Sequence, residues 1–174
     1  MKARVVYESI FGNTRAIAEA IAEGLAARFD TETVEITSAS ESAAGLDLIV
    51  IGGPTHAWAM SRPTTREAGR AQARKLGIDP VSGDIGVREW LARVVDGAGT
   101  KAAVFDTAVE SFGIFSGGSA AKGEAKAFRR AGFELIDEPQ QFRVAVKDDR
   151  TVLIAGELER ARKWGEQLAE RAAP

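Results

Sequence analysis

The sequence predicts an α/β fold in three layers, a doubly wound five-stranded parallel sheet between two layers of helices. Short runs rich in Val and Ile alternate along the chain with longer segments whose apolar residues recur every three or four positions, which is typical of parallel strands joined by crossover helices. One run, residues 46–51, is apolar throughout and predicts a central strand buried on both faces. The 174 residues contain no repeat or linker, so we expect a single domain over residues 1–174.

Five segments of the chain have the extended, apolar pattern of strands. The second is expected at an edge of the sheet because Glu35 interrupts its apolar run. The third is expected to end at Gly52-Gly53-Pro54, where a regular element should stop. After the fifth, residues 136–155 resume an extended pattern, either as an insertion that splits strand five or as a surface excursion. The strands are expected at residues 3–8, 33–37, 46–51, 100–107 and 133–136.

Helices are predicted between and after these strands. In the first helix Ile17 and Ile21 fall on one apolar face, and charged side chains fall on the other. Pro63 suits the first position of the next helix, where a proline costs no hydrogen bond. Trp90 and Trp164 lie in two later helices, and we expect both to pack in the core. The helices are expected at residues 16–25, 63–76, 87–95, 120–131 and 156–172.

The composition excludes several classes of protein. Lys plus Arg number 23 and Asp plus Glu number 25, a balance that argues against a dedicated nucleic-acid or polybasic membrane surface. Without cysteine, the chain has no disulfide, thiolate metal site or cysteine nucleophile. With His56 as its single histidine, the chain has too few histidine ligands for a typical zinc site, and a Ser–His–Asp triad would have to use His56. Since no signal peptide or membrane-spanning run is visible, we expect a cytoplasmic protein.

The loops after strands one, three and four are the expected ligand sites, because a doubly wound sheet binds ligands at the carboxyl ends of its strands. The first loop, residues 9–14, offers hydroxyl groups, the Asn13 amide, and Gly12, which lets the backbone approach an anion. The helix that follows adds free N–H groups and a partial positive charge. These features suit a phosphate group. The alternative is that Asn13 or Thr14 only caps the helix.

The first loop, with the sequence YESIFGNT at residues 7–14, resembles the phosphate loop of flavodoxins and related FMN-binding proteins. The segment GPTHAW at residues 53–58 resembles the second flavin loop of the same superfamily, in the branch that contains FMN-dependent quinone reductases. Residues 106–118 lie where the family places its last flavin loop. The resemblance follows the order of elements over nearly the whole chain, and it implies a flavodoxin-like strand order 2-1-3-4-5 and one FMN.

The resemblance also implies which residues contact FMN. The phosphate would be held by Ser9, Ile10, Phe11, Gly12, Asn13 and Thr14. The isoalloxazine would be flanked by Pro54, Thr55, His56, Ala57 and Trp58, with the Trp58 indole as a stacking partner. Backbone atoms of Asp106, Thr107 and Ala108 would face the ribityl chain or the pyrimidine edge. The other face of the ring would be covered by Phe112 or Phe115.

Some of these residues have a simpler interpretation as parts of the framework. Trp58 could be a lid over an apolar cleft, and His56 could hydrogen-bond only to backbone within its own loop. Asp106 could cap a helix or bridge two loops. If His56 does reach the flavin or a substrate, an imidazole with a pKa of ~6.5 could donate a proton.

The sequence departs from the flavodoxin pattern in three respects. Phe11 occupies a position that is often Thr, the third loop has no tyrosine, and the net charge of -2 contrasts with strongly acidic flavodoxins. We favour an electron carrier that serves redox partner proteins over an enzyme. One alternative is an FMN-dependent NAD(P)H:quinone or flavin reductase, in which Arg62 and Arg66 would help to bind an anionic or nicotinamide substrate. The other is a flavodoxin-fold module that has lost its flavin.

Overall fold

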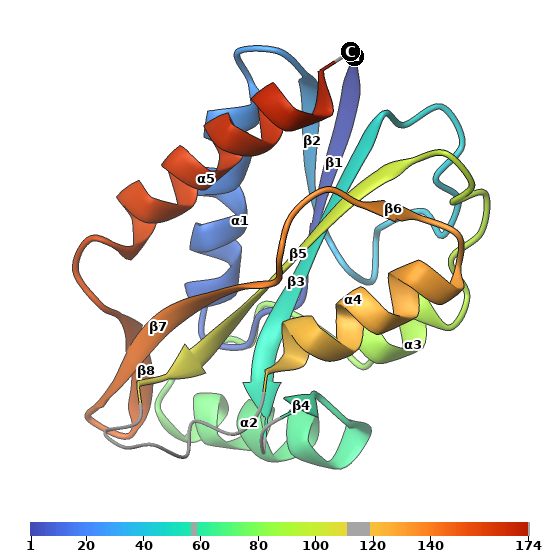
Figure 1. The fold of residues 1–174 in the computed structure, drawn as a ribbon. Coiled ribbons are helices and arrows are strands. Elements are labelled where there is room, and N and C mark those ends of the chain that lie inside the picture. Colours follow the sequence, from blue (N-terminus) through green and yellow to red (C-terminus); the bar gives the residue numbers. More distant parts are fainter. Residues whose placement is uncertain (57–58, 111–118, 174) are drawn as a thin grey trace.

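The computed structural model describes residues 1–56, 59–110 and 119–173 and arranges them as a sheet covered by helices (Figure 1). The strands are β1 (Lys2–Tyr7), β2 (Asp30–Glu35), β3 (Leu48–His56), β4 (Ala59–Met60), β5 (Lys101–Val109), β6 (Glu134–Leu135), β7 (Gln140–Lys147) and β8 (Arg150–Leu153). The helices are α1 (Asn13–Leu25), α2 (Pro63–Lys75), α3 (Val87–Leu91), α4 (Ala120–Arg130) and α5 (Glu157–Ala172). Across these described ranges, no helix is both long and apolar enough to cross a bilayer.

The sheet has the predicted order of strands. Its parallel part runs β2-β1-β3-β5-β7, and β8 is added antiparallel beyond β7. Since β5 is the fourth strand expected from the sequence and β7 occupies the fifth position, the 2-1-3-4-5 arrangement is confirmed. The strand order reverses between β1 and β3, so the crevice for a ligand is expected at the carboxyl ends of these strands.

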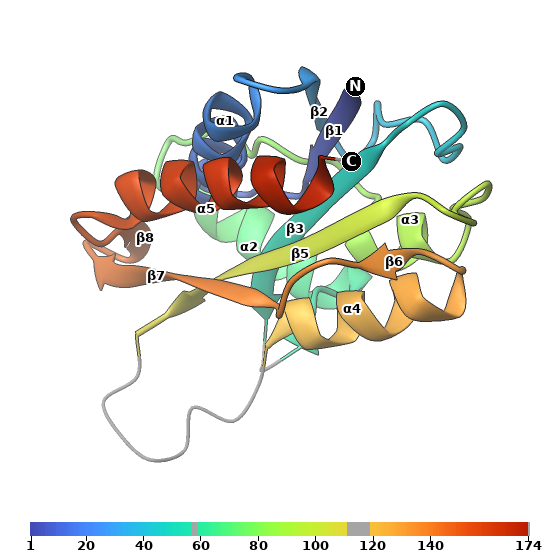
Figure 2. The same ribbon diagram turned by 45° about the horizontal axis from the view of Figure 1, so that its top comes forward.

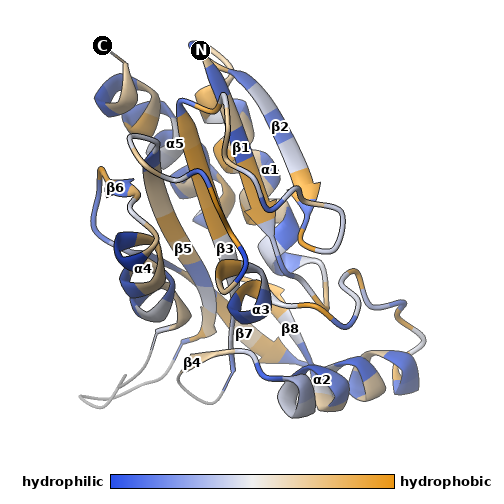
Figure 3. Ribbon diagram, turned by 90° about the vertical axis from the view of Figure 1, so that its right-hand side faces the viewer, coloured by the Kyte–Doolittle hydropathy of each residue, from blue (hydrophilic) through white to orange (hydrophobic). Residues whose placement is uncertain are grey.

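Helices cover both faces of the sheet (Figure 2). α1 and α5 lie side by side on one face, and α3 and α4 lie on the other. Along the strands, Val5 and Val50 pack toward α1 and α5, whereas Val6 and Ile51 pack toward α3 and α4. Figure 3 shows the apolar residues concentrated in β1, β3 and β5, with α2 near one end of the sheet and both termini at the other. The carboxyl ends of the strands therefore meet at the end that carries α2.

Two glycines let α1 and α5 approach closely. A Cβ on Gly24 would lie 2.7 Å from the backbone nitrogen of Glu166, and a Cβ on Gly165 would lie 3.1 Å from the Gly24 Cα. Each would also overlap a backbone carbonyl oxygen of the facing helix. Because side chains do not fit between these backbones, the contact fixes how α5 sits over α1 and over the core beneath them.

The largest differences from the expected ends of the elements occur in β3 and α3. β3 continues past Gly52 to His56, and Pro54 pairs in register with Thr107 of β5. The prediction that β3 ends at Gly52-Gly53-Pro54 is therefore wrong. The pairing with β1 stops at Gly52, so β3 is an edge strand beyond this point and tolerates a proline. α3 ends earlier than residue 95, because the Val95 N–H leaves the helix and donates to the Glu41 carbonyl.

Strand five is divided into two pieces. β6 pairs with the start of β5 at Lys101↔Glu134, and β7 pairs with its end from Phe105↔Gln140 onward. Residues 136–139 leave the sheet between the two pieces. β7 then turns back into β8. Of the two possibilities for residues 136–155, the structure shows the one in which strand five is split.

Candidate functional site

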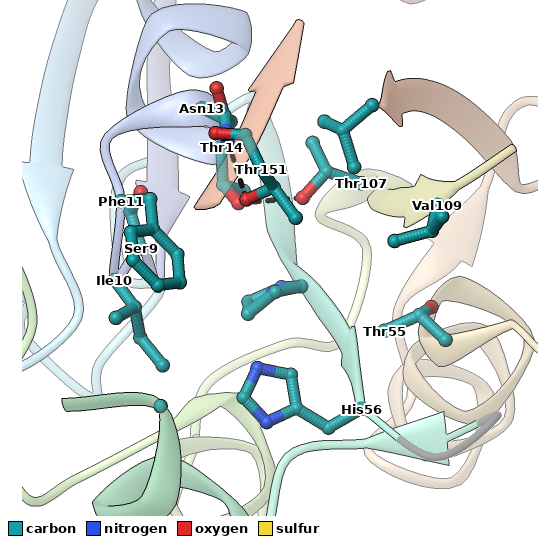
Figure 4. A pocket seen from close by; sticks show the side chains of 13 residues that line it. Ser9, Ile10, Phe11, Asn13, Thr14, Thr55, His56, Thr107, Val109 and Thr151 are labelled. Carbon is teal, nitrogen blue, oxygen red and sulfur yellow. Dashed lines mark hydrogen bonds between the residues drawn. The ribbon is translucent and has the colours of Figure 1, made fainter. Parts of the chain in front are cut away.

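A cavity of about 100 Å³ lies at the carboxyl edge of the sheet, between the loop of residues 9–14 and the ends of β3 and β5 (Figure 4). Most of its lining belongs to the loops predicted from the sequence, and the rest comes from α2, β5 and the β7–β8 hairpin. The lining residues are Ser9, Ile10, Phe11, Asn13, Thr14, Pro54, Thr55, His56, Gly69, Thr107, Val109, Val144 and Thr151.

The first turn of α1 faces this cavity without a side-chain cap. Gly12 occupies the N-cap position with φ of 90° and ψ of -10°, a left-handed conformation that favours glycine. Within the described residues, no side chain accepts a hydrogen bond from the N–H groups of residues 13–15 in the first turn. The first N–H groups and the helix dipole therefore give the adjoining part of the cavity a partial positive charge.

Asn13 and Thr14 do not cap α1, so the simpler interpretation of this loop does not hold. Asn13 Nδ2 donates to the carbonyl oxygen and to the Oγ1 of Thr151, each at 2.9 Å. Thr14 Oγ1 lies 2.8 Å from Thr107 Oγ1 (Figure 4). Both side chains instead tie the loop to β8 and β5, and the start of α1 stays open to an external acceptor.

Hydrogen bonds with Ser82 also hold this loop in place. Ser9 N donates to Ser82 Oγ at 2.8 Å, and Ser82 N donates to the Ser9 carbonyl at 2.7 Å. Gly12 N donates to Ser9 Oγ at 3.1 Å. Because Ser9 Oγ accepts this bond, its own proton is free to be donated to a ligand. The loop is thus pre-organised to present a hydroxyl group next to the start of α1.

The imidazole of His56 projects into the cavity from the end of β3 (Figure 4). Burial lowers its pKa below the usual value, a hydrogen bond with the Thr65 backbone acts against this, and the charge of Arg66 lowers the pKa further. We therefore expect a neutral imidazole at pH 7, with one donor and one acceptor nitrogen. This corrects the idea of a ready proton donor with an ordinary pKa.

Asp106 lies behind the cavity and not among the residues that line it. Its Oδ2 accepts hydrogen bonds from Thr55 Oγ1 at 3.0 Å, from Ser119 Oγ at 2.6 Å and from Ala121 N at 3.1 Å. The carboxylate therefore joins the end of β3 to the start of α4. This bridging role is the simpler of the two interpretations of Asp106.

The other predicted contacts fall into two groups. Thr107 lines the cavity, whereas Gly12 and Ala108 do not. Four residues lie outside the described part of the chain, and their contact with FMN stays a prediction: Ala57, Trp58, Phe112 and Phe115.

Arg66 is buried in the framework and does not serve as a substrate-binding cation. Its guanidinium lies 2.9 Å from Glu89 Oε2 and donates to Ser61 Oγ and to the Asp84 carbonyl, each at 2.9 Å. Ser61 Oγ in turn donates to Glu8 Oε2 at 2.8 Å. Only 2% of Arg66 is exposed. Its charge is therefore already neutralised within the framework.

Glu124 is a second buried carboxyl group behind the site. It is 0% exposed, and both of its oxygens lack a hydrogen-bond partner among the described residues. A Cβ on Gly53 would lie 3.6 Å from Glu124 Oε1 and 3.6 Å from Glu8 Oε2, so the two carboxyl groups flank this glycine. Burial, with Asp106 and Glu8 nearby, raises the pKa of Glu124 well above its usual value. Among the described residues, no cluster of three or more His, Cys, Asp or Glu side chains is arranged to hold a metal ion.

Comparison with known proteins gives a family match for the N-terminal part and a fold match for nearly the whole chain. Residues 4–66 match the family model described as a flavodoxin domain. A solved flavodoxin from the domain Archaea covers 99% of both chains at 22% identity, with a TM-score of 0.65. The chain has a flavodoxin-like fold. Oxidised Flavodoxin 1 from Bacillus cereus covers 98% of both chains at 18% identity, with a TM-score of 0.66.

The flavodoxin fold also occurs within longer proteins. The flavodiiron protein from Giardia intestinalis matches 98% of this chain and 36% of its own, at 19% identity and a TM-score of 0.61. No curated protein matches the sequence. The structural matches therefore show that the chain has the flavodoxin fold over nearly its whole length.

The sequence did not identify four of the lining residues. Gly69 belongs to α2, Val109 to the end of β5, and Val144 and Thr151 to the β7–β8 hairpin. Val109 could have been found, since it extends strand four by two residues beyond the predicted end. The hairpin residues carry no motif, because they reach the site only when β7 pairs with β5.

Proposed function

We propose that this flavodoxin-like protein binds one FMN at the cavity and carries electrons between redox partner proteins. The phosphate would lie at the start of α1, where the first-turn N–H groups and the hydroxyl groups of Ser9 and Thr14 converge. The uncapped α1 N-terminus beside the cavity, with Gly12 at φ of 90°, carries this assignment. Open N–H groups and hydroxyl donors are complementary to a phosphate dianion.

The remaining contacts follow from the same placement. A cavity of about 100 Å³ suits the phosphate end of the nucleotide, so the rest of the flavin would extend beyond it. Within the described part of the chain, the cavity wall next to this opening is formed by Ile10, Phe11, Pro54, Thr55 and His56. When bound, FMN supplies the electron chemistry. The chain holds the nucleotide, and the neutral His56 offers it a hydrogen bond without adding positive charge.

The charged side chains in the described part of the chain fit an electron carrier better than they fit a reductase. The reductase alternative named Arg62 and Arg66 as cations for an anionic substrate. Arg66 is paired with Glu89 inside the framework, whereas Arg62 is exposed. The family match and the fold support electron transport. The identity of the redox partner and the cytoplasmic location belong to this proposal and stay predictions.

The proposal is tested by titrating FMN into flavin-free protein and following the quenching of flavin fluorescence. We expect one FMN per chain, with visible flavin absorption retained after desalting. Ser9→Ala removes one hydroxyl donor to the phosphate and should weaken binding about ten- to hundredfold, the range expected for a hydrogen bond to a charged group. Ser38→Ala, at an exposed position, is the matched control and should bind FMN as the wild type does.

Two results would count against the proposal. Absence of quenching and of retained flavin would favour a module that has lost FMN. If the FMN-loaded protein by itself oxidised NAD(P)H with a quinone as acceptor, the reductase would replace the carrier.

A further inference from the structure

A groove of about 470 Å³ opens between α3, α4 and β4, away from the lining of the cofactor cavity. Met60, Leu91 and Val94 contribute apolar surface to it, and Lys126 and Arg130 contribute positive charge. The described residues that line this groove include no acidic side chain. Apolar surface bordered by charge of one sign is the pattern of a protein-docking site.

The positive charge of the groove belongs to one exposed face of α4. The helix carries Lys122, Lys126, Arg129 and Arg130, all exposed, and its single acidic residue, Glu124, is buried. None of these four cations is in an ion pair within the described residues, and the segments 57–58 and 111–118 contain no Asp or Glu in the sequence. In a chain with a net charge of -2, this is a local concentration of uncompensated positive charge.

Other helices neutralise their arginines along their own surface. In α5, Arg162 pairs with Glu159 at 2.7 Å and also with Glu166. In α2, Arg70 pairs with Glu67 at 2.5 Å. A basic helix face without such partners is therefore a particular feature of α4 and not the general composition of the surface. On the other flank of α4, Glu138 lines a neighbouring hollow together with Lys122 and Arg129. The side of α4 that faces the groove is therefore the more positive one.

The groove and the cofactor cavity adjoin the same β-hairpin. Thr55 and His56 line the cavity, and β3 pairs with β4 through Thr55↔Met60, which places Met60 in the groove. The start of α4 is tied to this hairpin as well, because Ala120 N donates to Thr55 Oγ1 at 2.9 Å. A protein seated in the groove would thus rest against an element that forms the cavity wall.

We propose that the α3–α4–β4 groove docks an acidic redox protein, with its carboxylates opposite Lys126 and Arg130 and an apolar side chain over Met60 and Leu91. This inference rests on the proposed electron-carrier function and specifies the kind of partner. Complementary charge speeds encounter and fixes orientation, and the effect weakens as salt screens it. The polarity is opposite to that expected of an acidic carrier that docks on basic partners.

The test measures electron transfer between the FMN-loaded protein and an acidic [2Fe–2S] ferredoxin by stopped flow, over a range of salt concentrations. The double variant Lys126→Glu/Arg130→Glu should lower the second-order rate constant about tenfold or more at low salt and remove its decrease with salt. The matched control Lys2→Glu/Arg28→Glu makes the same change of net charge at exposed positions on other elements. It should change the rate constant by less than about threefold.

The outcomes separate the docking site from the cofactor site. FMN affinity, measured by fluorescence quenching, should be equal in the wild type and in both double variants. If no form binds FMN, the carrier function fails, and docking is then measured as salt-dependent binding of the ferredoxin to the flavin-free chain by calorimetry. Equal effects of the two double variants, a preference for basic cytochrome c over the ferredoxin, or binding of duplex DNA in place of the ferredoxin would overturn the inference.

Discussion

Replacing Glu124 by glutamine should stabilise the protein at neutral pH, by an amount that grows with pH. The buried carboxyl group has no hydrogen-bond partner among the described residues, and burial beside Asp106 and Glu8 raises its pKa well above the usual value. The folded protein therefore keeps this group protonated at a pH where the unfolded chain, with a glutamate pKa of ~4.3, ionises it. Stability is then lost as pH rises from the unfolded pKa toward the folded pKa.

The size of this pH dependence follows from the binding of one proton by Glu124. In that pH window the folded state holds one more proton at Glu124 than the unfolded state, so the free energy of unfolding falls by about 1.4 kcal/mol per pH unit. Glu124→Gln has nearly the same shape and cannot ionise, so it loses this dependence. The two proteins should have similar stability near pH ~4 and diverge above it.

Urea unfolding of both proteins at several values between about pH 4 and pH 8 measures this difference. Glu134→Gln removes the same charge at an exposed position of β6 and serves as the control, with an expected change within about 0.5 kcal/mol. A difference between wild type and Glu124→Gln that stays constant across this range would refute the reasoning, because it would show that Glu124 has the same proton affinity in both states.

Three further predictions concern packing, the histidine and the loop. Gly165→Ala should cost about 1–3 kcal/mol in urea unfolding, because its Cβ would overlap the Ile21 carbonyl oxygen; a loss below about 0.5 kcal/mol would mean that the helices can separate. Burial lowers the pKa of His56, so unfolding titrations should show the wild type losing stability as pH falls below ~6.5, whereas His56→Gln should lack this loss. Asn13→Ala removes both bonds to Thr151 and should cost about 1–2 kcal/mol and speed amide exchange in β8; unchanged exchange would contradict this role.

The alternation of strands and helices predicted a doubly wound parallel sheet, and the resemblance of the loops to those of flavodoxins implied its strand order. The exact ends of the elements were not predictable, since they depend on residues far away in the chain. Pro54 is a strand breaker by local rules, but β3 tolerates it where β1 no longer pairs beside it. α3 stops early because Val95 binds Glu41, a contact that no local pattern announces.

The candidate site, too, was only partly predictable from the sequence. Loop 9–14 could be identified because its glycine, hydroxyl and amide residues are unusual directly before a helix. The Thr151 contact could not, since it requires the β7–β8 hairpin to fold back onto the loop. The burial of Arg66 and its ion pair with Glu89 depend on packing, so the sequence could not exclude a substrate-binding role for this arginine. Glu124 has the pattern of an ordinary helix residue between two lysines, and only packing reveals that it is buried.

The most direct test of the central claim compares the affinities of the flavin-free protein for FMN and for riboflavin, which lacks the phosphate. If the open start of α1 and Ser9 hold the phosphate, two charge-assisted hydrogen bonds of about 1.5–3 kcal/mol each should make FMN bind at least a hundredfold more tightly. Ser9→Ala should narrow this ratio by weakening FMN alone. Equal affinities for the two flavins, or a ratio that Ser9→Ala leaves unchanged, would contradict the assignment of the phosphate to this loop.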